Sequence, residues 1–395
     1  MNSKAPLFTR DFVLICFATF LFYCAQWLAL TAIPLLLKQM GLGAEFVGGY
    51  LGAFALGALI ARFPIGGAVD RFGSRVFGVS GAGLIGIGCI LYALMLFVPV
   101  RMSFITAVPL LLPFAGIAHS VGFSIYGTSA ISFVAYAAPS ARRGEAVAYY
   151  GILINVATAM AAGVSLLIVA AWGFTILFAT AATLAALAAI LASNLREAPR
   201  AGDSRESTAS ALRIETKVLV PGFANTALAA SNGAAVAFVP LLGLARGIAN
   251  PGLYFTAVAL TSILSRAVAG RLVDKYGRAV SIIPGMLLAS VGLLLVAQTF
   301  STDMLVVAGL VFGIGSASAM PALQALAIDL AGPAQRGSAM ATYWAMIDLG
   351  VSLGSILAGQ IAPVVGYGGL FIAASTAPLV GLGIFMAYAH SSSSE

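Results

Sequence analysis

Charged side chains are scarce in this chain: Asp, Glu, Lys and Arg together make up 8% of its 395 residues. A soluble domain carries about 25% charged residues, so this chain has too few to cover a surface in water. Hydrophobic residues reach 61%, and the mean hydropathy is +1.03. Their runs do not alternate with polar residues as the strands of a membrane β-barrel do. The sequence therefore predicts an all-α protein that crosses a membrane many times.

Cysteine and histidine are also few, with three copies and two copies. Cys16, Cys24 and Cys89 lie singly within apolar runs, which excludes a disulfide framework and a CxxC metal site. The sequence holds no nucleophile with a base, no metal-ligand spacing and no Walker or GxGxxG loop. We therefore expect no enzyme and no cofactor. The first apolar run, 12–37, is too long for a signal peptide and predicts a membrane helix.

The formal charge of +7 does not indicate nucleic-acid binding, because the basic residues lie in short loops between apolar runs. Fifteen of the twenty Lys and Arg residues fall on one side of the predicted membrane, and Lys38, Arg101 and Arg246 fall on the other. Basic loops stay in the cytoplasm. We expect a multi-pass protein of the inner (plasma) membrane with both termini cytoplasmic.

Charge, glycine and proline divide the apolar runs into twelve predicted membrane helices. One break stands out, because residues 196–217 hold nine charged residues in 22. It predicts a cytoplasmic linker between two six-helix bundles, 1–195 and 218–390, and residues 391–395 predict a disordered tail. The predicted helices are 12–37, 45–66, 76–99, 104–136, 146–170, 174–194, 218–244, 252–272, 279–300, 304–330, 338–364 and 369–389.

The two predicted bundles repeat in sequence. "RFPIGGAVDRFGSRV" (62–76) matches "RAVAGRLVDKYGRAV" (266–280) at an offset of 204, and "RRGEAVAYYGILINV" (142–156) matches "QRGSAMATYWAMIDL" (335–349) at an offset of 193. A weaker match aligns Gln26 with Asn232 at an offset of 206. Two parallel six-helix repeats are the construction of one large class of transporter.

These motifs resemble the Major Facilitator Superfamily, whose loop signature is G-x-x-x-D-[RK]-x-G-[RK]-[RK]. The two copies lie in equivalent predicted loops, and the first has Ser74 where the signature has a basic residue. The resemblance covers essentially the whole chain and implies two bundles that rock about a central site. The matching residues are Gly66, Asp70, Arg71, Gly73 and Arg75 in the first copy, and Gly270, Asp274, Lys275, Gly277 and Arg278 in the second.

The motif residues are candidates for a cytoplasmic gate. Arg62, Gly66 and Asp70 are spaced by four, so they form one stripe on a helix. An aspartate at the membrane boundary can accept the free N–H groups of another helix, and the resemblance implies that it latches the gate. We expect Arg62 and Arg266 to pair within this gate network rather than contact a substrate. Asp329 is a candidate partner for basic loop residues, and its counterpart in the first half is Tyr136.

Two ionisable residues fall inside predicted membrane helices and are candidates for proton or cation coupling. Asp348 is the acid placed nearest mid-membrane, and its repeat counterpart is the neutral Asn155. The other is His119, and a histidine side chain can titrate near neutral pH. An ionisable residue inside a membrane indicates function by default. For both, a hydrogen bond that serves only helix packing is the alternative.

The remaining polar and aromatic residues at this level are candidates for substrate binding. The resemblance implies that the first, fourth, seventh and tenth helices line the central cavity, with contributions from the fifth and eleventh. Aromatic rings there suit an amphipathic ligand and, by their charge distribution, a cation. Packing is the alternative for each ring. The candidates are Gln26, Trp27, Tyr126, Tyr150, Asn155, Asn232, Gln324, Tyr343 and Trp344.

These observations favour proton-coupled export of a small amphipathic or cationic organic molecule. The stretch "RGSAMATYWAMIDLGVSLGS" resembles the eleventh helix of small bacterial exporters of drugs and metallophores. Departures from that resemblance leave uptake or facilitated diffusion of a metabolite open: Ala161-Ala162 replaces a Gly-Pro, and Gln26 and His119 stand near the place of an expected acid. A transport-inactive sensor or lipid-handling protein is a further alternative. We expect membrane lipids and protons as partners, and a monomer.

Overall fold

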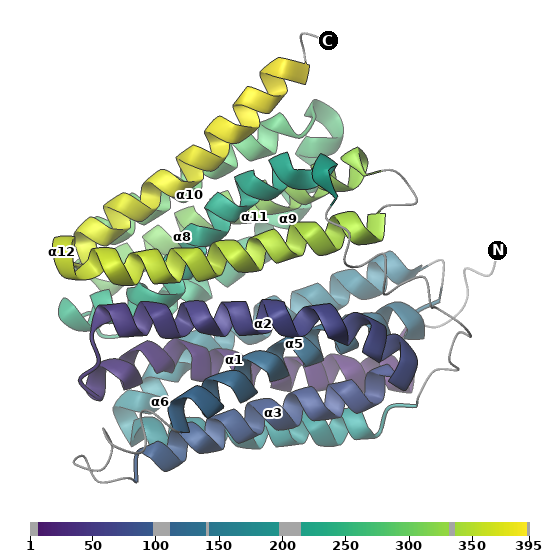
Figure 1. The fold of residues 1–395 in the computed structure, drawn as a ribbon, viewed down its shortest axis with the longest axis vertical. Helices are drawn as coiled ribbons and strands as arrows, with labels where there is room; N and C mark the ends of the chain where they lie inside the picture. The colour runs from purple at the N-terminus through teal and green to yellow at the C-terminus, as the bar shows by residue number, and fades with distance from the viewer. Residues whose placement is uncertain (1–6, 98–110, 140–141, 197–214, 332–335, 393–395) are drawn as a thin grey trace. The chain divides into compact units, whose positions relative to one another are not determined.

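The computed structural model describes residues 7–97, 111–139, 142–196, 215–331 and 336–392. Within these ranges every regular element is helical, which confirms the all-α prediction (Figure 1). Apart from the short 3₁₀ helix η3 (Thr216–Val218), the elements are α1 (Arg10–Gln39), α2 (Ala44–Phe72), α3 (Ser74–Met95), α5 (Leu112–Ala137), α6 (Arg143–Ser193), α8 (Leu219–Ala245), α9 (Leu253–Tyr276), α10 (Ala279–Gln298), α11 (Thr302–Leu330) and α12 (Arg336–Ser392).

Two of these helices are long enough to cross a bilayer twice. At about 1.5 Å per residue, the 51 residues of α6 and the 57 of α12 each exceed twice the roughly 30 Å of a hydrocarbon core. Each helix breaks at one glycine with positive φ, Gly173 (81°) in α6 and Gly366 (71°) in α12. The described residues therefore form twelve helical arms, and each arm overlaps one predicted membrane helix.

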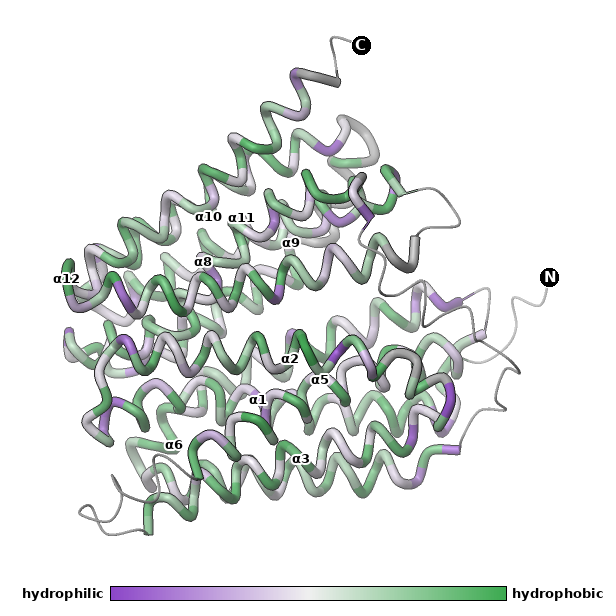
Figure 2. The backbone as a smooth tube through the Cα atoms, in the orientation of Figure 1, coloured by the Kyte–Doolittle hydropathy of each residue, from purple (hydrophilic) through white to green (hydrophobic). Residues whose placement is uncertain are grey.

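The exterior of these helices is suited to lipid. Nine helices in the described ranges are long and apolar enough to span a membrane, and α9 adds the apolar stretch Leu253–Ser265. Figure 2 shows that hydrophobic residues follow one another along the helices. Large apolar side chains stay exposed, including Phe17 (62% exposed), Ile60 (67%) and Leu264 (71%). Water would not tolerate so many exposed apolar residues, whereas hydrocarbon does.

The backbone repeats at the same offsets as the sequence. The described glycines with positive φ form three pairs: Gly41 with Gly247, Gly73 with Gly277, and Gly173 with Gly366. These pairs are separated by 206, 204 and 193 residues, the three offsets of the sequence repeats. Only glycine adopts such φ values without steric cost. Each half therefore turns its chain at equivalent places.

Close helix crossings repeat as well. In the first half, a Cβ atom added to Gly81 of α3 would lie 2.7 Å from the Tyr126 backbone nitrogen of α5. At the equivalent crossing of α10 and α11, a Cβ atom added to Gly285 would lie 2.8 Å from the Gly315 carbonyl oxygen. Glycine is needed there because membrane helices that approach this closely leave no room for a side chain.

The chain divides into two compact units. Unit 1 comprises Met1–Ala32 and Gly57–Thr208, and unit 2 comprises Ile33–Leu56 and Ala209–Glu395. The beginning of α2 therefore belongs with α12. There the Ser352 hydroxyl donates a 2.9 Å hydrogen bond to the Gly52 carbonyl, and a Cβ atom on Gly48 would lie 2.7 Å from the Gly359 Cα.

Candidate functional site

A buried polar pair links α1 and α5 in unit 1. The Nε2 atom of His119 lies 2.7 Å from the Oε1 atom of Gln26, and both side chains are buried. An amide oxygen only accepts, so Nε2 carries the proton in this bond. The Tyr92 ring meets the imidazole edge to face at a centroid distance of 6.0 Å. The structure thus brings together two residues that the sequence assigned to different roles.

Tyrosines from three helices of unit 1 lie together. Tyr126 of α5 stacks on Phe22 of α1 with ring centroids 3.7 Å apart, and its hydroxyl lies 3.4 Å from the Thr19 Oγ1 atom. The side chains of Tyr23 of α1 and Tyr150 of α6 lie close together. Tyr126 and Tyr150 are buried, whereas Tyr23 and Trp27 are half-buried. The sequence analysis did not include Tyr23 among the site residues.

The equivalent tyrosine of unit 2 has a different partner. Tyr343 of α12 accepts a 2.9 Å hydrogen bond from the Nδ2 atom of Asn225 in α8, and its own hydroxyl donates to the Met320 carbonyl. Asn225 is fully buried, and its Oδ1 atom has no hydrogen-bond partner among the described residues. The sequence analysis missed Asn225. Its position 206 residues after Thr19, the offset of the first-helix repeat, was the signal that could have found it.

Asp348 lies on the first arm of α12, twelve residues after Arg336, which is about 18 Å along the helix axis. Its side chain is half-buried, and Trp344 one turn earlier is 40% exposed. On the same arm the Ser355 hydroxyl donates to the Gly233 carbonyl of α8. The arm is therefore held on both sides of Asp348, by Asn225 before it and by Gly233 after it.

The other predicted polar residues lie in different settings. Asn155 donates from Nδ2 to the Gly151 carbonyl of its own helix at 2.8 Å. Asn232 is exposed and Gln324 is half-buried. Asn155 therefore occupies the repeat position of Asp348 but satisfies its amide within one helix.

The candidate gate is described in part. Gly73 and Gly277 end α2 and α9 with φ values of 94° and 83°. Arg71 lies over the ring of Phe72 at 5.1 Å, and Arg75 is exposed. Arg278 forms an ion pair with Asp329 at the end of α11. The other gate candidates lie outside what the structure describes. They are the side chains of Asp70, Arg266, Asp274 and Lys275, and the surroundings of Gly66 and Gly270.

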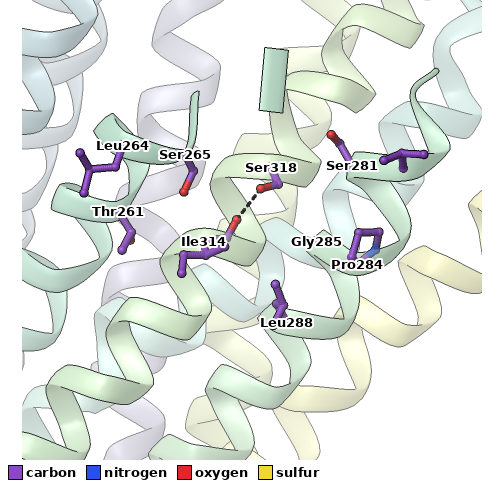
Figure 3. Close-up of a pocket in the computed structure, with 10 residues that line it drawn as sticks. Thr261, Leu264, Ser265, Ser281, Pro284, Gly285, Leu288, Ile314 and Ser318 are labelled. Carbon is purple, nitrogen blue, oxygen red and sulfur yellow. Dashed lines mark hydrogen bonds between the residues drawn. The ribbon is translucent and has the colours of Figure 1, made fainter. Parts of the chain in front are cut away.

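Two cavities lie in unit 2, and neither contains a predicted site residue. One, of about 370 Å³, lies between α9 and α10 over α11, where Ser318 donates a 2.8 Å hydrogen bond to the Ile314 carbonyl (Figure 3). Thr261, Ser265 and Ser281 add further hydroxyl groups to its lining. The other, of about 290 Å³, lies between α8 and the two arms of α12. The described residues of both linings carry no charge, and neither Asp348 nor His119 is among them.

The comparisons with known proteins agree with the repeated twelve-arm architecture. The family model described as Major Facilitator Superfamily matches residues 15–249 and 222–394. The chain therefore belongs to the Major Facilitator Superfamily, a family of multi-pass membrane transporters, as the sequence motifs predicted. An uncharacterised MFS-type transporter of Burkholderia pseudomallei (strain 1106a) is 26% identical over 370 residues, which cover 93% of this chain and 89% of that protein.

Solved structures of transporters share the fold. A bacterial homologue of the human lysosomal transporter Spinster, in an inward-facing and unoccupied conformation, matches with a TM-score of 0.77 at 15% identity. The alignment covers 97% of each chain. The nucleoside transporter NupG matches with a TM-score of 0.76 at 14% identity, over 96% of this chain and 99% of that one. At these identities the likeness shows the fold alone.

Proposed function

We propose that this protein is a secondary active transporter that exports a small amphipathic or cationic organic molecule across the inner membrane in exchange for protons. The observation that carries the proposal is Asp348, an acidic residue about 18 Å along a membrane-spanning arm. A carboxylate at this depth is costly in hydrocarbon and is retained where it binds ions or substrates. Its repeat counterpart is neutral, so the scaffold itself does not require the charge.

Protonation of Asp348 removes the cost of its charge, and binding of a cationic substrate neutralises the same charge in another way. One carboxylate can therefore hold either a proton or a cation, and competition between them couples export to proton entry. Tyr126, Tyr150, Tyr343 and Trp344 supply aromatic surface for an amphipathic molecule. His119 and Gln26 form the second polar centre, which we assign to proton handling or substrate binding in the first half.

Alternating access supplies the mechanism. The two bundles rock about the central site, and the motif loops after α2 and α9 close the cytoplasmic side. Arg278 and Asp329 form part of this gate, together with the motif aspartates. The basic loops support cytoplasmic positions for both termini, and in this proposal the transporter works as a monomer surrounded by membrane lipids.

The proposal is tested in proteoliposomes that contain the purified full chain, with substrates found by thermal-stabilisation screening of amines, drugs and metabolites. A pH gradient of one unit holds about 1.4 kcal/mol per proton, which sustains about a tenfold substrate gradient. We expect wild type to build that gradient and Asp348→Asn to lose it. Asp303→Asn, an exposed acid at the start of α11, is the matched control and should behave as wild type.

Each result decides one part of the proposal. Full gradient-driven transport by Asp348→Asn would show that the coupling acid lies elsewhere. If the substrate instead accumulates on the side to which the protons flow, protons and substrate move in the same direction. That result would replace export by proton-coupled uptake. Flux that equilibrates without responding to pH would leave facilitated diffusion, and a complete lack of flux across the library would contradict transport.

A further inference from the structure

The cavity of about 370 Å³ in unit 2 opens at the surface of the bundle, between α9 and α10 and over α11 (Figure 3). Its lining runs from Ser281, in the first turn of α10, to Leu288, about 10 Å further along that helix. On its rim Leu264 is 71% exposed and Ile314 is 40% exposed. Because the chain spans a membrane, exposed apolar side chains of this size suit contact with hydrocarbon.

Four hydroxyl groups interrupt this apolar lining; they belong to Thr261, Ser265, Ser281 and Ser318. The Thr261 and Ser318 hydroxyls donate to carbonyls of their own helices at 2.9 and 2.8 Å, so they present acceptor lone pairs to the cavity. The Ser265 and Ser281 hydroxyls make no hydrogen bond within the described part of the chain, and Ser281 is only 3% exposed. A buried hydroxyl without a partner is costly, and a ligand with acceptor oxygens would remove that cost.

The first half has no hydroxyl at the same four positions. The sequence offsets of 204 for α9 and α10 and 193 for α11 also align the two glycine crossings, Gly81 with Gly285 and Gly122 with Gly315. At these offsets the counterparts of the four hydroxyl residues are Gly57, Ala61, Phe77 and Ile125. The shared scaffold therefore folds without these hydroxyls, and helix packing alone does not explain all four in the second half.

The position of the cavity and its chemistry match the ester region of a phospholipid. Arg278 directly precedes α10 and pairs with Asp329, and such charged side chains lie at the edge of the hydrocarbon. Ser281, three residues after Arg278, therefore lies near the level where acyl chains join the glycerol. Ester carbonyls are uncharged acceptors, and the described lining offers hydroxyl donors without any charged side chain.

We propose that Ser265 and Ser281, together with Thr261 and Ser318, form a binding site for the ester-linked region of a membrane phospholipid. The acyl chain of this lipid lies along the apolar wall that includes Leu288. The site belongs to the second half alone. The inference depends on the membrane-spanning fold and not on the direction or coupling of transport.

The test compares two phospholipids with the same head group and chain length, one with ester-linked and one with ether-linked chains. The ether lipid keeps the size and charge but lacks the carbonyl acceptors. Binding to the purified full chain is measured by native mass spectrometry. We expect wild type to bind the diester lipid about three- to tenfold more tightly, the range that a neutral hydrogen bond allows. Ser265→Ala combined with Ser281→Ala should abolish this preference.

Three further measurements locate the lipid and control for folding. A phospholipid with a photoactivatable group in its acyl chain should crosslink to the segments of α9, α10 and α11 around Leu264 and Leu288. Ser281→Phe copies Phe77 of the first half, fills the cavity and should weaken binding of both lipids. Ser80→Ala, on an exposed face of α3, should retain the wild-type preference. Thermal unfolding verifies each fold, and the crosslinks of wild type decide the location if Ser281→Phe does not fold.

The opposite results would overturn the site. Equal binding of the diester and diether lipids by wild type would exclude recognition of the ester. A double alanine variant that keeps the full preference would show that the serines do not recognise it. Crosslinks confined to other helices would place the lipid elsewhere. Displacement of the crosslinked lipid by a transported molecule at its working concentration would assign the cavity to the substrate instead.

Discussion

The two halves of this molecule share a scaffold but differ in their polar residues. Gly81 and Gly122 make the crossing of α3 and α5, and Gly285 and Gly315 make the equivalent crossing of α10 and α11. The positions between these crossings have diverged. The two halves therefore share the backbone contacts of these crossings but differ in the polar side chains of the same helices.

The polar pairs show this divergence residue by residue. In the first half Gln26 and His119 are buried and bonded to each other. Their repeat counterparts are Asn232, which is exposed, and Phe312, which is buried. The second half instead has Asp348 where the first has Asn155. The two halves thus place their ionisable candidates, His119 and Asp348, at different positions of the repeat.

The largest expected effect follows from exchanging Asp348 and Asn155. Asp348→Asn makes the second half resemble the first at this position and should abolish the roughly tenfold substrate gradient that a one-unit pH gradient sustains. Asn155→Asp in the same chain should not restore it, because the Asn155 side chain turns to the Gly151 carbonyl of its own helix. The measurement is accumulation in proteoliposomes. Restoration by the exchanged chain would show that the two positions are equivalent.

The shared scaffold predicts equal damage in both halves. Gly122→Val and Gly315→Val each place a side chain against the backbone of the neighbouring helix, since a Cβ atom on Gly122 would lie 2.7 Å from the Gly81 carbonyl and one on Gly315 would lie closer than 3 Å to the Gly285 carbonyl. Overpacking of this kind costs about 1–3 kcal/mol or more. Thermal unfolding midpoints in detergent should fall by similar amounts. Gly83→Ala on α3, where a Cβ atom meets nothing within 4 Å, is the control and should not lower the midpoint.

The architecture was predictable from sequence because hydrocarbon imposes it. Apolar runs give the spans, and two motif copies in register give the repeat. The predicted helices 146–170 and 174–194 end within a few residues of the two arms of α6 (Arg143–Ser193), which meet at Gly173. Membership of the Major Facilitator Superfamily followed from the motifs alone.

The partners inside the site were less predictable, because they depend on how each helix is rotated about its axis. Sequence spacing placed Gln26 and His119 at a similar depth, but did not bring them together. Asn225 was missed for the same reason. The position of a polar residue within an apolar run predicts its depth in the membrane. Only the packed structure shows which neighbouring helix the side chain faces.

A smaller effect should follow when the first half is made to resemble the second at His119. His119→Phe copies Phe312 and removes the 2.7 Å bond to Gln26, which leaves the amide buried. An unsatisfied buried polar group costs about 1–3 kcal/mol, so the thermal unfolding midpoint should fall. The double variant Gln26→Leu with His119→Phe removes both partners and should recover most of the loss. If the double variant is no more stable than the single one, the pair is not what stabilises this contact.

The smallest expected effect concerns the ion pair of Arg278 and Asp329, which has no charged counterpart in the first half, where Ser74 and Tyr136 stand. The two side chains are 26% and 58% exposed, and exposed pairs contribute about 1 kcal/mol or less. Asp329→Asn should therefore barely move the unfolding midpoint, and added salt should erase the difference. Glu145→Gln breaks a similarly exposed pair with Arg142 and should also leave the midpoint nearly unchanged.

Transport rates distinguish the two variants. If Asp329 helps close the cytoplasmic gate, Asp329→Asn removes about 1 kcal/mol of stability from one state of the gate and changes flux by up to about fivefold. Glu145→Gln should leave flux unchanged. Equal flux in both variants would reduce Asp329 to a surface charge and leave the gate to the motif aspartates.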